Sequence, residues 1–146
     1  MNVFNTDKSH LTPHELAMAS NTIIRQKYRK DFTLEFSRDR KSMSAYVTTA
    51  AKGASGSGQP GGKMFVKGAP ESVIERCTHI RCGTEKVPMT PRLKQEILKL
   101  VHQYGTGGDT LRCLALGTID DPPRKQNMDL EDSKKFITYE VMILYI

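Results

Sequence analysis

The sequence contains no apolar run that approaches the ~20 residues needed to span a bilayer as a helix. Its first residues also lack the basic region and apolar segment of a secretory signal. We therefore expect a water-facing domain that makes no direct contact with a membrane.

Cysteine is scarce. Cys77, Cys82 and Cys113 are three in number, so they cannot all pair within the chain. Cys77 and Cys82 have no second pair of ligands beside them to complete a tetrahedral zinc site. This pattern predicts small reduced thiols in a reducing compartment, and no metal site within the chain.

A phosphate-binding P-loop is also missing. Residues 50–62 are rich in Gly, Ala and Ser and precede a lysine, which invites that interpretation. The motif, however, requires Gly where Ser57 stands and Ser or Thr where Met64 stands. We expect a flexible surface loop over residues 50–62 instead.

The length and charge of the chain leave several functions open. Its 146 residues suffice for one domain with a real core, and we find no internal repeat or linker, so residues 1–146 are expected to form a single domain. Twenty-two Lys and Arg against 16 Asp and Glu give a net charge of +6. Such an excess suits nucleic acid, phosphate ligands and acidic surfaces alike.

Capping residues mark two helices. A capping box at Thr12 and Glu15 starts the first helix, which we expect to run to about Arg29. Thr90 caps the second helix, and Gly105 ends it. The apolar side chains at helical spacing are expected to pack in the core: Leu16, Ala19, Ile23 and Ile24 in the first helix, and Leu93, Ile97, Leu100, Val101 and Tyr104 in the second.

Apolar segments between these helices predict strands, which makes the chain an α/β protein of the α+β type. The strands are expected over residues 32–36, 43–48, 64–66, 78–82, 111–118 and 138–146. The polar turn at 38–41 makes the first two strands antiparallel. Residues 111–118 are expected to form a buried central strand, and residues 120–132 an acidic loop.

The run Lys67-Gly68-Ala69-Pro70-Glu71 follows one of these strands. Gly68 lets a ligand or another backbone approach closely, and Pro70 suits the first position of a helix. An anion at this junction could meet both the Lys67 ammonium and free helix N–H groups.

Two further segments have the composition that a nucleotide requires. Residues 36–44 place an aromatic ring and three cations at the end of a strand, and residues 109–116 carry one arginine in an apolar stretch. An adenine needs a flat apolar partner, and a triphosphate needs several cations. Phe36 could supply the ring face. The charges could come from Arg38, Lys41, Lys67 and Arg112. We interpret Arg40 as a solvated surface charge outside this site.

Taken together, these segments resemble the nucleotide-binding domain of P-type cation pumps. The run at 67–71 is typical of much of that group, whereas residues 36–44 and 105–116 look like the calcium-transporting ATPases of the sarcoplasmic and endoplasmic reticulum. The resemblance runs from Met1 to about Tyr139. It implies a mainly antiparallel sheet flanked by helices, at the cytosolic face of the reticulum membrane within a parent pump.

The same resemblance implies roles for single residues. Phe36 matches the phenylalanine that stacks on adenine, and Arg38 and Lys41 match cations that contact the nucleotide. Lys67 and Gly68 match the pocket lysine and glycine, and Arg112 matches an arginine near the phosphates. In the parent pump, the resemblance implies, the domain binds Mg-ATP, works with the phosphorylation and actuator domains, and delivers the γ-phosphate to an aspartate.

Two departures qualify the resemblance. The Asp-Lys-Thr-Gly-Thr run that carries this aspartate in the family is absent, as are the acidic adenine contacts that precede the segment matching Met1. We therefore expect the chain to hold no catalytic residue, to bind ATP and to hydrolyse none. Residues 140–146 cease to resemble the pumps, which predicts an altered C-terminal boundary and a frayed or mispaired final strand.

Two other classes of function remain open. A basic nucleic-acid-binding module would use the net charge and the cationic turn, although no aromatic-interleaved basic stripe accompanies them. A protein-interaction fragment would use an exposed end strand at 141–146.

Overall fold

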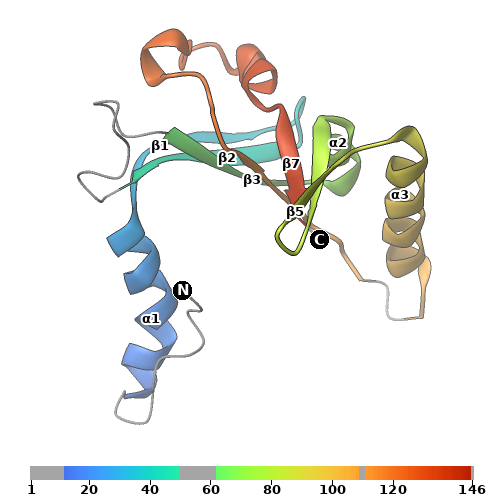
Figure 1. Cartoon of the computed structure of the whole chain (residues 1–146), viewed down its shortest axis with the longest axis horizontal. Coiled ribbons are helices and arrows are strands. Elements are labelled where there is room, and N and C mark those ends of the chain that lie inside the picture. Colours follow the sequence, from blue (N-terminus) through green and yellow to red (C-terminus); the bar gives the residue numbers. More distant parts are fainter. Residues whose placement is uncertain (1–11, 50–61, 109–110, 146) are drawn as a thin grey trace.

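The computed structural model describes residues 12–49, 62–108 and 111–145, and shows one seven-stranded sheet with helices at its sides (Figure 1). The strands are β1 (Tyr28–Ser37), β2 (Ser42–Thr49), β3 (Gly62–Gly68), β4 (Cys77–Cys82), β5 (Glu85–Pro88), β6 (Ala115–Ile119) and β7 (Met142–Tyr145). The helices are α1 (Pro13–Lys27), α2 (Pro70–Glu75) and α3 (Pro91–Thr106), with 3-10 turns η2 (Lys125–Asn127) and η3 (Ser133–Tyr139).

The strand order across the sheet is β1-β2-β3-β6-β7-β4-β5. Among the described strands, every neighbouring pair is antiparallel except β4 and β7, which run parallel. The expected α+β fold with a mainly antiparallel sheet is confirmed. Residues 50–61 of the expected surface loop lie outside the described residues, and Gly62 already belongs to β3.

Capping side chains fix where the two long helices begin. The Thr12 hydroxyl accepts a hydrogen bond from the Glu15 amide at 3.3 Å, and the Glu15 carboxylate accepts one from the Thr12 amide at 2.9 Å, so the capping box is formed. The Thr90 hydroxyl accepts a hydrogen bond from the Leu93 amide at 3.2 Å in the same manner. Helix α1 ends at Lys27, earlier than expected, because the next residue already has extended backbone angles and starts β1.

The hydrophobic core lies on one face of the sheet, against α2 and the 3-10 turns. Its buried members are Leu34, Tyr46, Met64, Val66, Val73, Ile74, Cys77, Ile80, Ala115, Ile119, Met128, Phe136, Met142 and Leu144. Full burial of a large apolar side chain stabilises the fold by about 1.5–3 kcal/mol. This face therefore supplies the main driving force for folding.

The apolar face expected for α1 is not buried. Leu16 is 47% exposed and Ile24 is 55% exposed, and α1 has no buried residue. The reason is its position, because α1 projects away from the sheet (Figure 1) and packs mainly against β1. The prediction that this face joins the core was wrong.

Three of the five apolar residues predicted to face the core from α3 do so. Leu93, Ile97 and Val101 pack against the core, and Leu98 joins them. The other two predicted members, Leu100 and Tyr104, are 49% and 54% exposed. The side of α3 that packs against the core is therefore rotated relative to the predicted stripe, and its residues there are only partly buried.

The last two predicted strands are shorter than expected. Strand β6 is central, but it begins at Ala115, and Leu111 and Leu114 before it are exposed. Residues 133–139 form the 3-10 turn η3, and only Met142–Tyr145 form a strand.

Strand β7 lies inside the sheet. It pairs with β6 on one side and with β4 on the other, and Met142, Ile143 and Leu144 are buried. Three apolar residues in succession suit a strand that is covered on both faces. The predictions of a frayed final strand and of an exposed end strand for protein interaction were therefore wrong.

Candidate nucleotide pocket

The candidate site lies on the face of the sheet opposite the core. Met43 on β2 is the cross-strand partner of Lys67 on β3, and Lys67 is the partner of Leu116 on β6. These three side chains therefore stand in a row across three strands. Their neighbours along each strand, such as Ser44 and Val66, are buried on the core side, as the two-residue period of a strand requires.

Phe36 reaches this outer face because of an irregularity in β1. Strict alternation would place it on the core face with Phe32 and Leu34. The register with β2 shifts between Leu34 and Ser37, where β1 holds one more residue than its partner. Such a bulge re-aims the side chains that follow it. The Phe36 ring is 61% exposed and free to stack on a planar ligand.

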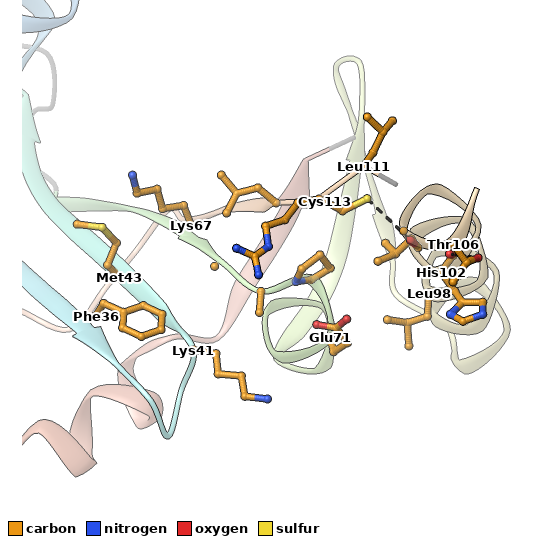
Figure 2. Close-up of a pocket in the computed structure, with 17 residues that line it drawn as sticks. Phe36, Lys41, Met43, Lys67, Glu71, Leu98, His102, Thr106, Leu111 and Cys113 are labelled. Carbon is orange, nitrogen blue, oxygen red and sulfur yellow. Dashed lines mark hydrogen bonds between the residues drawn. The ribbon is translucent and has the colours of Figure 1, made fainter. Parts of the chain in front are cut away.

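A pocket of about 1050 Å³ opens between this part of the sheet and α3 (Figure 2). Its sheet side carries Phe36, Met43 and Lys67, and its α3 side carries His102 and Thr106. The remaining lining residues are Lys41, Gly68, Ala69, Pro70, Glu71, Leu98, Val101, Gly105, Leu111, Arg112, Cys113 and Leu114. The pocket is large enough for a nucleotide.

The structure brings most of the predicted site residues together. Lys41, Lys67 and Arg112 line the pocket from three separate segments, and among the described residues Glu71 is the one carboxylate in the lining. Arg38 is the exception, because it is exposed in the turn at 38–41 and does not line the pocket. A surplus of cations beside an apolar wall suits an anionic ligand with a planar ring.

Gly68 is required by the packing of the protein itself. A Cβ on Gly68 would stand 2.5 Å from the Lys41 carbonyl oxygen and 2.7 Å from the Ser42 Cβ. Lys41 has a positive φ of 48°, and its carbonyl accepts a hydrogen bond from the Ala69 amide at 2.9 Å. The glycine therefore allows the turn at 38–41 to approach the end of β3.

The interpretation of Arg40 as a solvated surface charge was wrong. Its side chain is 1% exposed and forms an ion pair with Glu140, which is fully buried. The guanidinium also donates to the carbonyl oxygens of Leu34, at 2.7 Å, and Glu35, and lies 5.3 Å from the centre of the Phe136 ring. Burial lowers the pKa of Arg40, and the Glu140 carboxylate opposes this effect. An arginine with these partners can remain charged inside the protein.

Sequence reasoning also missed pocket residues. Met43 lies within the segment 36–44, at the start of the strand expected over residues 43–48, but its face of the sheet could not be assigned from the sequence. Leu98, His102 and Thr106 come from α3, and no local signal relates them to Phe36 or Lys67. Their position depends on how α3 packs against α2.

A family model described as "P-type ATPase, cytoplasmic domain N" matches residues 9–144. The chain belongs to this family. The match includes residues 140–144, so the expectation that the resemblance ends near Tyr139 was wrong. Membership gives this N domain a nucleotide-binding role in a P-type ATPase, and the pocket between the sheet and α3 is its candidate site.

Two further observations describe the N domain. No described helix combines the length and the apolar composition needed to cross a bilayer. Within the described ranges, no group of three or more His, Cys, Asp or Glu side chains is placed to hold a metal ion.

Proposed function

We propose that this N domain binds ATP in the pocket between the sheet and α3, as part of a calcium-transporting P-type ATPase of the endoplasmic or sarcoplasmic reticulum. In the parent pump it presents the γ-phosphate of Mg-ATP to the aspartate of the phosphorylation domain, with the actuator domain as a further partner. No nucleic acid takes part.

One observation carries the proposal: an exposed aromatic ring and three cations, from segments far apart in the sequence, line a single pocket of a chain that belongs to the N-domain family. The role of each side chain follows from its chemistry. Phe36 stacks on adenine, with Met43 as its apolar neighbour. Lys41, Lys67 and Arg112 attract the phosphates. The planar guanidinium of Arg112 can donate two parallel hydrogen bonds to phosphate oxygens, whereas the lysine ammonium groups act as mobile point charges.

Gly68 contributes through its backbone, because it keeps Lys67 and the turn at 38–41 close together. Arg38 is exposed at the turn. It acts as a peripheral cation that draws the nucleotide toward the pocket, and its loss should weaken ATP binding less than loss of Lys67.

Titration of the isotope-labelled chain with ATP, followed by NMR, tests the proposal. We expect saturable shifts at Phe36, Met43 and Lys67, with a dissociation constant near the millimolar level, about −4 kcal/mol. Binding should weaken as salt is added, and ATP should not be hydrolysed. Single-stranded DNA at equal phosphate concentration should not compete.

Absence of ATP-induced shifts, together with tight and salt-sensitive DNA binding, would overturn the proposal and favour a nucleic-acid-binding module. The calcium assignment has its own test. In the protein that contains this chain, purified and reconstituted in vesicles, ATP should drive calcium uptake. Transport of a different cation would overturn that part of the proposal while leaving the ATP site intact.

A further inference from the structure

A buried charge cluster lies behind the pocket, on the core side of the sheet. Its members are Arg40, Ser42, Ser44, Arg76 and Glu140. Each oxygen of the Glu140 carboxylate has one arginine and one serine as partners. Oε1 contacts Arg40 and Ser44, and Oε2 accepts from Arg76 at 3.0 Å and from Ser42 at 2.9 Å.

The two arginines connect this carboxylate to two neighbouring segments that line the pocket. Arg40 belongs to the turn at 38–41, which follows Phe36 and presents Lys41. Arg76 directly follows α2, the helix that begins after Lys67 and Gly68. Arg76 also donates to the Arg40 carbonyl oxygen at 3.0 Å, so the two parts contact each other as well as Glu140.

Such a cluster adds little net stability, because removing charges from water costs about as much as their attraction returns. Charged hydrogen bonds to a guanidinium fork are nevertheless strongly directional. They fix distances and angles in a way that apolar packing does not. The cluster is therefore better suited to setting the position of the turn than to holding the fold together.

We propose that Glu140 is a positioning residue of the ATP site, acting through Arg40 and Arg76 without touching the nucleotide. It fixes the turn that follows Phe36 and presents Lys41 against the strand end that carries Lys67. The ring and the two ammonium groups are then spaced for one ligand before it arrives. This inference rests on the proposed function of the pocket.

The test uses the 146-residue chain with Glu140→Gln and Glu140→Ala. Glutamine keeps the shape, but its NH2 group cannot accept a hydrogen bond, so one of the two arginine contacts is lost. Relative to wild type, we expect the dissociation constant for ATP to rise about threefold in Glu140→Gln and about tenfold in Glu140→Ala. Binding of AMP and of inorganic triphosphate should both weaken, since the ring and Lys41 move together.

A structural readout separates positioning from stability. In the ligand-free state, the NMR signals of Phe36 and Lys41 should shift in both Glu140 variants. The matched control is Ile80→Ala, which truncates a side chain that is 1% exposed in β4 and does not line the pocket. It should lower the melting temperature while leaving both the turn signals and the ATP affinity at wild-type values.

Folded Glu140 variants with wild-type ATP affinity and unmoved turn signals would overturn the positioning role. If Glu140→Ala does not fold, Glu140→Gln alone decides the question. A wild-type chain that binds no ATP would instead overturn the proposed function, so the two failures can be told apart.

Discussion

The carbonyl oxygen of Lys41 accepts a hydrogen bond from the amide of Ala69, at 2.9 Å, and so joins the turn after β1 to the end of β3. The neighbouring residues Ser42 and Gly68 are cross-strand partners. Because of these contacts, the backbone holds side chains from distant parts of the sequence in fixed positions around the pocket. Single substitutions there should change binding one group at a time.

Phe36→Ala should remove the preference for adenine. The ring is exposed, so we expect the fold to survive and ATP binding to weaken by roughly 1–3 kcal/mol, while binding of inorganic triphosphate stays unchanged. Calorimetric titration with both ligands measures the difference. Phe65→Ala is the control, because Phe65 is 40% exposed on β3 and does not line this pocket. A folded Phe36→Ala chain that still prefers ATP would place the adenine elsewhere.

Lys67→Ala should weaken ATP and ADP together, by about 1.5–3 kcal/mol, because a mobile ammonium follows phosphate charge and does not read the base. Lys63→Ala removes the same charge from the same strand. Lys63 pairs with Asp120 at 2.8 Å and lies outside the pocket lining. Titration of both variants should show a loss for Lys67 only. Equal losses would mean that net charge, and not the position of Lys67, governs binding.

Gly68→Ala should destabilise the domain by about 1–3 kcal/mol, because the new methyl group would meet the Lys41 backbone at 2.5 Å. Gly108→Ala is the matched control, since a Cβ there meets no atom of the described residues within 4 Å. Urea unfolding of both variants measures the difference. A Gly68→Ala chain of wild-type stability would show that the turn can move away without cost.

The thiol of Cys77 should resist alkylation in the folded chain. Burial raises its pKa from 9.0 to about 11, and its Sγ donates to the Val73 carbonyl oxygen at 3.2 Å. At pH 8 roughly one Cys77 in a thousand would then be the reactive thiolate. Mass spectrometry after iodoacetamide treatment should find Cys82, which is exposed, modified first.

The same pKa gives a pH dependence of stability. A raised pKa means that the folded chain holds the thiol proton more tightly than the unfolded chain. This contribution is complete below about pH 9 and is lost as the pH rises toward 11. Urea unfolding of wild type and Cys77→Ser across this range should show the stability difference falling with pH. A constant difference would contradict the prediction.

Local signals in the sequence were sufficient where the cause is local. The capping residues Thr12 and Thr90 predicted helix starts correctly, and alternation predicted the position of β2 well. The lysine and glycine of the run at 67–71 lie where the strand-to-helix pattern indicated. Composition alone could not show that β7 lies between β6 and β4, because strand order depends on pairings between distant segments.

The missed features share a physical reason. Arg40 looks like any exposed cation until its partner is known, and that partner, Glu140, is far away in the sequence. A single extra residue in β1 turns Phe36 away from the core, although alternation alone assigns it to the same face as Leu34. Rules based on hydrophobic periodicity and on charge describe the average environment of each residue type. They fail where one long-range contact or one bulge decides the outcome.

The place of β7 also has a consequence for how the domain assembles. Strands β1, β2, β3 and β6 form one half of the sheet, β4 and β5 form the other, and in the described structure β7 supplies the backbone hydrogen bonds that join them. It follows all of them in the chain. During synthesis on the ribosome, the edges of β6 and β4 therefore stay unpaired until residues 142–145 emerge. Unpaired strand edges promote aggregation, so this step of folding is the most vulnerable one.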